Sequence, residues 1–260
     1  MPSQMLSERR DDALVLTLSD PATRNSLSPQ AYAAGLEAIA HAESDPEIRC
    51  VVLRGDGEHF CGGGNLQRLL AVRERGPDEQ LASMAALGAF VEALHAFPKP
   101  LVAAVEGYAA GAGCALVLAC DLVVAAEDAK FVLSYGRIGL SPDAGSTWQL
   151  SRRVPRALAL QMLWLPEPMP ARQWQGWGLV NEIVDHGHAL PAALAFAARL
   201  AAMAPNAVAS AKELMREAEG SSLPAQLDRE RDHFVRNLFH ANADEGLRAF
   251  LDKRAPRFGR

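Results

Sequence analysis

Residues 98–114 read PKPLVAAVEGYAAGAGC, and this stretch decides the fold class. Pro98 and Pro100 stop a preceding helix because proline has no amide hydrogen to donate. The apolar run 101–105 is typical of a buried strand, and the glycines that follow permit a tight turn into a helix that reaches Cys120. A buried strand followed by such a turn and a helix predicts an α/β fold.

The same arrangement occurs earlier in the chain. Residues 50–53 predict a short buried strand, the glycine-rich loop 55–64 follows, and a helix is expected over 65–74. Free N–H groups at the start of a helix attract negative charge, and two such amides pointing at one oxygen form an oxyanion hole. From the pattern alone, turns that serve only packing remain an alternative. The phosphate-loop pattern GxxxxGK[ST] and the hydrolase pattern GxSxG are both absent.

The rest of the chain continues the alternation of strands and helices. Strands are predicted over 13–18, 122–124 and 131–133, and helices over 28–40 and 80–97, the first with Ser28 as N-cap and Pro29 at its first position. Beyond Pro142 the pattern is mostly helical and ends in helices over 224–239 and 244–254. We expect an α/β core over residues 1–200. Residues 201–260 are expected to form a helical region that packs on a neighbouring copy of the chain or covers the site as a lid.

The charge balance argues against several classes of partner. The chain has 26 Lys and Arg against 31 Asp and Glu, so it lacks the basic surface of a nucleic-acid-binding protein. Its first dozen residues contain no apolar signal segment, and the uncharged stretch 107–120 is too short to cross a bilayer. Cys50, Cys61, Cys114 and Cys120 form no CxxC pair and are expected to be buried free thiols. These features predict a cytoplasmic protein with no membrane segment.

Several motifs together resemble the enoyl-CoA hydratase/isomerase (crotonase) family. They are HFCGGGNL at 59–66, the stretch 98–114 with its continuation 119–131, GLVNEI at 178–183 and KRAPRF at 253–258. They lie in the family's order over nearly the whole chain. The resemblance implies a spiral of ββα units, a homotrimer or dimer of trimers, and an acyl-CoA thioester as substrate. Coenzyme A would then be part of the substrate, and no separate cofactor is expected.

The resemblance also assigns residues to the thioester. The backbone amides of Gly64 and Ala112 would form the oxyanion hole, and a backbone N–H serves whatever its side chain. For the CoA moiety, the positions that match the family are Arg24, Asn25, Gly62 and Leu66. Phe250 and Lys253 would reach the phosphates of a neighbouring subunit. Without the resemblance, Lys253 would simply complement the dipole of the last helix.

The two glutamates that activate water in the family's hydratases are absent. Their positions hold Ala115 and Tyr135, and neither side chain is a useful base at neutral pH. Asp143 is the remaining carboxylate at a position that faces the acyl pocket in the family's isomerases and aryl-CoA dehalogenases. An aspartate just before a helix is also a common N-cap, which is the alternative reading. The segment 138–150 resembles the ring-opening epoxyphenylacetyl-CoA isomerases most.

We therefore predict an acyl-CoA isomerase that shifts a double bond or opens an epoxide-activated ring, with Asp143 as acid and base. A hydratase-like activity and a non-catalytic acyl-CoA-binding subunit remain open alternatives. A dehalogenase or hydrolase would use Asp143 as nucleophile and would need a second base, for which His95 is the candidate. His59 and His95 show no triad spacing, and His186 and His188 are expected in a solvated turn, so no metal site is predicted.

Overall fold

The computed structural model describes residues 3–259 and builds them around two sheets. The larger sheet has six strands in the order β1-β2-β3-β4-β6-β9, and all neighbours are parallel except β1 and β2. Its strands are β1 (Gln4–Arg10), β2 (Ala13–Ser19), β3 (Cys50–Gly55), β4 (Leu101–Val105), β6 (Leu122–Ala126) and β9 (Glu182–Val184). The smaller sheet consists of β5 (Tyr108–Ala110), β7 (Lys130–Val132) and β8 (Met169–Pro170).

The chain passes between the two sheets in repeated ββα turns. β4 of the larger sheet leads to β5 of the smaller one and then to α4 (Ala112–Ala119), and β6 is likewise followed by β7. Single parallel bridges join Cys61 to Ala109 and Leu27 to Gly64, which draws the two glycine-rich loops into the same layer. The observed alternation is the predicted spiral of ββα units.

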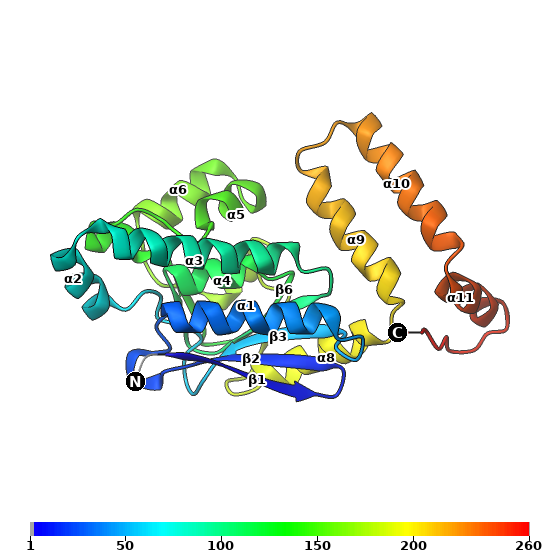
Figure 1. Ribbon diagram of the computed structural model, residues 1–260, viewed down its shortest axis with the longest axis horizontal. Helices are drawn as coiled ribbons and strands as arrows, with labels where there is room; N and C mark the ends of the chain where they lie inside the picture. The colour runs from blue at the N-terminus through cyan, green and yellow to red at the C-terminus, as the bar shows by residue number, and fades with distance from the viewer. Residues whose placement is uncertain (1–2, 260) are drawn as a thin grey trace.

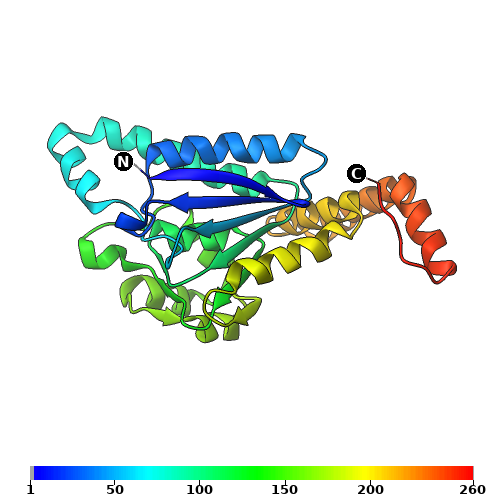
Figure 2. The same ribbon diagram turned by 90° about the horizontal axis from the view of Figure 1, so that it is seen from below.

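Helices cover both faces of the larger sheet (Figures 1 and 2). On one face lie α1 (Pro29–Ser44) and α3 (Pro77–Ala96), and on the other lies α8 (Ala189–Ala201). Alternate residues along the strands serve the two faces: Leu14 and Leu16 pack in the core under α1, and Val15 packs against α8. The remaining helices of the body are α2 (Leu66–Arg75), α5 (Ser146–Arg153), α6 (Arg156–Trp164), α7 (Ala171–Gly176) and the short 3₁₀ turns η1 (Pro21–Thr23) and η2 (Ser134–Ile138).

Most predicted elements are confirmed. Ser28 caps α1 by accepting a hydrogen bond from the Ala31 amide, with Pro29 at the first helical position. All four cysteines are buried and free. The predictions missed β1, β5, β8 and β9, and they began the helix at 80 although α3 starts at Pro77. Strand β1 was missed because its residues are mostly exposed and alternate weakly, as expected of an edge strand.

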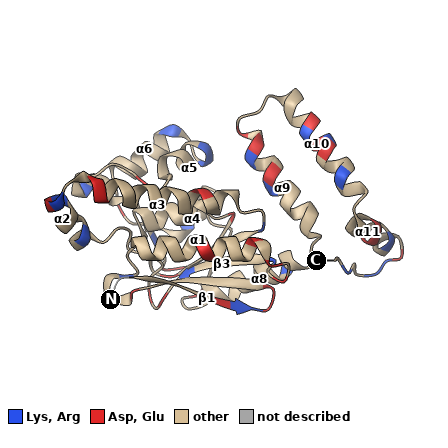
Figure 3. Cartoon of the chain, in the orientation of Figure 1, with Lys and Arg blue, Asp and Glu red and all other residues tan. Residues whose placement is uncertain are grey.

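The last three helices, α9 (Pro205–Ala218), α10 (Leu223–Leu238) and α11 (Ala241–Leu251), form an arm that stands apart from the body (Figure 1). Lys212 of α9 anchors the arm: its Nζ donates to Asp121 Oδ2 at 2.7 Å and to the Lys99 carbonyl at 3.1 Å. Along α9 and α10, acidic and basic residues are interspersed (Figure 3). The division between residues 200 and 201 stays a prediction.

Among the described helices, none is by itself long and apolar enough to cross a membrane. Together α8 and α9, bent by 108°, meet that test of length and composition as a pair.

Candidate active site

A main cavity of about 810 Å³ opens between α2, α3 and the loop after η2. Four of the residues predicted from sequence line it together: Gly64, Leu66, Ala112 and Asp143. They come from the two glycine-rich loops, the start of α2 and the segment that precedes α5, which are distant in sequence. The fold therefore brings the proposed oxyanion donors and the proposed acid/base to one cavity.

The two glycine-rich loops contact each other through their backbones. The Ala110 amide donates to the Cys61 carbonyl at 2.8 Å, and the Cys61 amide donates to the Tyr108 carbonyl at 3.0 Å. Gly63 has φ of +86°, and a Cβ there would lie 2.6 Å from the Ala110 oxygen and 3.5 Å from the Ala112 nitrogen. Only glycine permits both this conformation and this approach.

Within residues 3–259, the amides of Gly64 and Ala112 donate no hydrogen bond to another protein group. Ala112 is the first residue of α4, where an amide has no acceptor within the helix. Both residues line the main cavity. Two unused backbone donors at one cavity wall can polarise a carbonyl oxygen and stabilise the negative charge that develops on it.

Asp143 is half-buried, and its side chain does not cap a helix. The Tyr135 hydroxyl donates to Asp143 Oδ1 at 2.7 Å, whereas α5 has Gly145 at its N-cap position and no side-chain cap bond. The capping alternative is therefore wrong. Burial raises the pKa of Asp143 above its usual value, and the hydrogen bond from Tyr135 partly opposes that rise. Burial followed by the neighbouring Asp143 charge raises the pKa of Tyr135, which stays a neutral donor.

Asp143 is the one carboxylate among the described residues that line the main cavity. Ala115, at the position of one hydratase glutamate, is fully buried in the core and does not line the cavity. Tyr135, at the position of the other, bonds to Asp143. The cavity therefore has one carboxyl group and two unused backbone donors, without the paired carboxylates that hydration by the two-glutamate route requires.

The residues predicted to hold the CoA moiety divide into two groups. Leu66 lines the main cavity, whereas Arg24, Asn25, Gly62, Phe250 and Lys253 lie outside its lining. Arg24 is exposed, and Phe250 and Lys253 are exposed on or just after α11. The predicted roles of these residues stay predictions.

Asn25 ties the early loop to the first glycine-rich loop. It is fully buried, its Oδ1 accepts from the Asp20 amide at 2.9 Å, and its Nδ2 donates to the His59 carbonyl at 2.7 Å. The Gly62 amide donates to the Arg24 carbonyl at 2.7 Å. Since the Asn25 amide group is occupied in this way, its side chain braces the loop and only its backbone could face a ligand.

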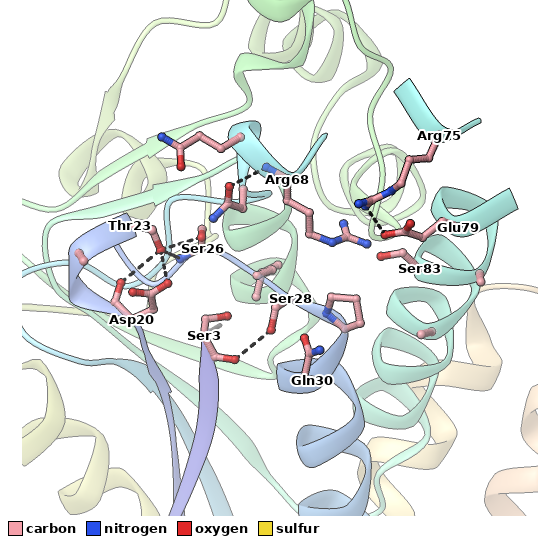
Figure 4. A pocket seen from close by; sticks show the side chains of 17 residues that line it. Ser3, Asp20, Thr23, Ser26, Ser28, Gln30, Arg68, Arg75, Glu79 and Ser83 are labelled. Atoms are coloured by element: carbon pink, nitrogen blue, oxygen red, sulfur yellow. Dashed lines mark hydrogen bonds and ion pairs between the residues drawn. The ribbon is translucent and has the colours of Figure 1, made fainter. Parts of the chain in front are cut away.

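A second, polar hollow of about 780 Å³ adjoins the main cavity, and the two share Leu27, Asn65 and Arg68 (Figure 4). Many of its polar groups pair with one another. The Arg75 guanidinium lies 2.9 Å from Glu79 Oε1, and the Ser28 hydroxyl donates to the Ser3 carbonyl at 2.9 Å. Figure 4 shows the Arg68 side chain extending across the hollow toward Ser83. Arg68 therefore separates a polar space from the more apolar main cavity.

No histidine among the described residues lines the main cavity. His95 hydrogen-bonds to Gln149 and packs edge-on against Trp148, with ring centroids 4.7 Å apart, and it does not line the main cavity. Burial lowers the pKa of His95. A nucleophilic route through Asp143 would need a second base in the cavity, and His95 does not supply it.

His186 lies in an exposed cluster with two carboxylates. Its Nδ1 is 3.1 Å from Asp128 and 3.7 Å from Glu106, and the hydrogen bond with Asp128 raises its pKa. Among the described residues this group is the one whose ligand atoms are close enough together to hold a metal ion. Both Glu106 oxygens accept backbone amides, from Gly187 and Ala189. The cluster is explained as an ion pair that also holds the start of α8.

Known proteins carry the same fold. A profile described as Enoyl-CoA hydratase/isomerase matches residues 8–260. The chain belongs to the enoyl-CoA hydratase/isomerase family. An enoyl-CoA hydratase structure from Polaromonas sp. JS666 superposes with a TM-score of 0.97 at 51% identity, covering 98% of this chain and 100% of the other. The crotonase-type fold predicted from the motifs is thereby confirmed.

Two relatives from Escherichia coli K12 carry different reaction names. A 1,2-epoxyphenylacetyl-CoA isomerase is 36% identical over 257 residues, covering 98% of this chain and 97% of the relative. A 2,3-dehydroadipyl-CoA hydratase is also 36% identical, over 260 residues and 98% of both chains. The first agrees with the subgroup that the sequence resembles. Identity alone does not separate isomerase from hydratase, so the finer reaction depends on the site residues.

Part of the cavity wall consists of residues that no sequence motif marks. Tyr32 fits the helical spacing of α1 and was assigned to no site, yet it lines the main cavity, as do Arg68 of α2 and Met84 and Leu87 of α3. Tyr32 is also buried. No local signal distinguishes a buried face that meets other side chains from one that meets a cavity.

Proposed function

We propose that the protein is an acyl-CoA isomerase that shifts a double bond, or opens an epoxide-activated ring, through a thioester enolate. The observation that carries the proposal is the position of Asp143. Its carboxyl group has a raised pKa and lines the main cavity with the free amides of Gly64 and Ala112. A single acid/base and an oxyanion hole suffice for an isomerisation, because the proton that is removed can be returned to another carbon.

In a 3-enoyl-CoA, the Asp143 carboxylate removes a proton from the carbon next to the thioester carbonyl. The electron pair moves toward the carbonyl oxygen and forms a dienolate, whose oxygen accepts hydrogen bonds from the Gly64 and Ala112 amides. The carboxyl group of Asp143 then returns the proton to the γ carbon, which leaves a 2-enoyl-CoA. Tyr135 keeps the carboxyl group oriented during both transfers. We place the CoA moiety beside Arg24, Gly62 and Leu66.

The decisive experiment replaces Asp143 with Asn, which keeps the shape and removes the base. We expect D143N to lose at least about 100-fold in isomerisation of a 3-enoyl-CoA and in deuterium uptake from deuterated water. Binding of the thioester, measured by calorimetry, should persist. The matched control is E127Q, which alters an exposed carboxyl group in the loop after β6. Full turnover by D143N would refute the assignment, and hydration of a 2-enoyl-CoA without isomerisation would favour the hydratase alternative.

We further propose that the arm of α9–α11 packs against other copies of the chain to form a trimer or a dimer of trimers. The arm carries many exposed large apolar side chains, including Phe239 at 84% and Phe250 at 83% exposure. Apolar surface of this extent on a monomer is unfavourable in water and marks an interaction surface. In such an assembly Phe250 and Lys253 would lie against a neighbouring subunit, as the family resemblance implies.

A further inference from the structure

Tyr32 of α1 is a buried residue whose hydroxyl faces the main cavity. The residue is 3% exposed and lines the cavity together with Arg68 and Asp143. Within residues 3–259, no hydrogen bond satisfies its hydroxyl. The described side-chain N and O atoms that are both sealed from solvent and unpartnered belong to Ser3, Ser83, Trp174, Gln226 and His233. Since Tyr32 is not among them, its oxygen must be accessible, and the access is from the cavity.

The surroundings keep this hydroxyl a donor. Burial raises the pKa of Tyr32 to about 12, with Arg68 opposing and Asp143 reinforcing the rise. The phenol is therefore neutral at physiological pH and has one hydrogen to donate. No protein group accepts from this donor, so a bound acyl group either supplies an acceptor or displaces the cavity water and leaves the donor unpaired, and a group that supplies the acceptor binds more tightly.

We propose that the Tyr32 hydroxyl donates a hydrogen bond to an oxygen atom that the acyl group carries in addition to its thioester carbonyl oxygen. The preferred substrates are then CoA thioesters whose acyl group bears a hydroxyl, an epoxide or a ring oxygen, rather than plain hydrocarbon chains. The inference rests on the proposed function, because it places the acyl group in the main cavity. Arg68 adds to the preference, since a cation near the site favours an oxygen with partial negative charge.

Apolar side chains make up much of the remaining wall and would accept the hydrocarbon part of such an acyl group. They include Leu27, Leu69, Val72, Met84, Leu87 and Leu140. A mostly apolar pocket with a few placed polar groups is the usual form of a site that fixes the orientation of its ligand. Tyr32 would thus act in specificity, while Asp143 transfers the proton.

The test compares binding of phenylacetyl-CoA with that of its 3-hydroxy and 4-hydroxy analogues, which differ from it by one oxygen. By calorimetry, the wild-type protein should bind at least one hydroxylated analogue about fivefold more tightly than phenylacetyl-CoA. Y32F should lose this preference and keep its affinity for phenylacetyl-CoA within about twofold. The matched control is Y108F, because Tyr108 lies on β5 outside the cavity lining and should retain the preference.

Equal affinities of the wild-type protein for all three thioesters would overturn the proposal, as would an unchanged preference in Y32F. Thermal unfolding of Y32F checks that the variant is folded. If Y32F does not fold, the affinities of the wild-type protein for the three thioesters still test the proposal. The assay needs no turnover. Failure of the isomerase proposal would appear as absent proton exchange in the wild-type protein, and failure of this one as absent discrimination between the thioesters.

Discussion

The Tyr135 hydroxyl donates a 2.7 Å hydrogen bond to Oδ1 of Asp143, and the two residues are eight positions apart in the chain. This bond lowers the pKa of Asp143 against the larger effect of burial, which raises it. The tyrosine at the position of a hydratase glutamate therefore orients the carboxyl group that we propose as acid/base and lowers its pKa.

Replacing Tyr135 with Phe should move the acid limb of the kcat/KM profile to higher pH. Removing the donated hydrogen bond destabilises the Asp143 carboxylate, so its pKa rises and the base form is lost at a higher pH as the solution is acidified. The measurement is isomerisation of a 3-enoyl-CoA across the pH range. Y108F should leave the limb in place, and a shift of the Y135F limb to lower pH would contradict the assignment.

Substitution of Gly63 by Ala should impair catalysis far more than the same change at Gly57. Both glycines have positive φ, at +86° and +68°, so the backbone strain of alanine is similar at the two sites. At Gly63 the added Cβ would lie 2.6 Å from the Ala110 oxygen, whereas nothing lies within 4 Å at Gly57.

Because the clash displaces the loop that holds the oxyanion amides, we expect kcat/KM of G63A to fall about 100-fold. G57A should stay near the wild-type value while its melting temperature falls slightly. Equal losses in the two variants would show that strain alone, and not the approach of the loops, limits the activity.

Introducing a charge at the apolar surface of the arm should weaken the assembly. In F239E a buried glutamate would replace the aromatic ring at the interface between copies, so the mass measured by light scattering should fall from the trimer or hexamer toward the monomer. R236E serves as the control because Arg236 is an exposed charged residue of α10. An unchanged mass for F239E would remove Phe239 from the interface.

The elements that sequence analysis found are those with strong local signals. The run at β4, the glycine turn and α4 were predictable because apolar β-branched and small residues, glycines and flanking prolines all favour one arrangement. Strand β1 lacks such a signal, since Glu8, Arg9 and Arg10 are exposed at the sheet edge.

The site was predictable in its positions and less so in its contacts. Gly64, Ala112 and Asp143 come to one cavity as expected. The bond between Tyr135 and Asp143 depends on a loop in which Gly139 and Ala144 adopt left-handed conformations, at φ of +70° and +48°. A non-glycine residue with positive φ is held there by its surroundings, and composition does not reveal it. The exposure of Tyr32 to a cavity depends likewise on how α2 and α3 lie over α1.

Both proposed oxyanion donors are main-chain amides, and the bonds that join their loops run between backbone groups of Cys61, Tyr108 and Ala110. Apart from the glycines that permit this approach, the part of the site that we propose to activate the carbonyl is independent of side-chain identity. Evolution can therefore change the proton-transfer group or the acyl wall by a single codon and leave the activated thioester in place. Because the backbone donors and the variable side chains are separate, the same fold can acquire a different reaction while it keeps its two backbone donors.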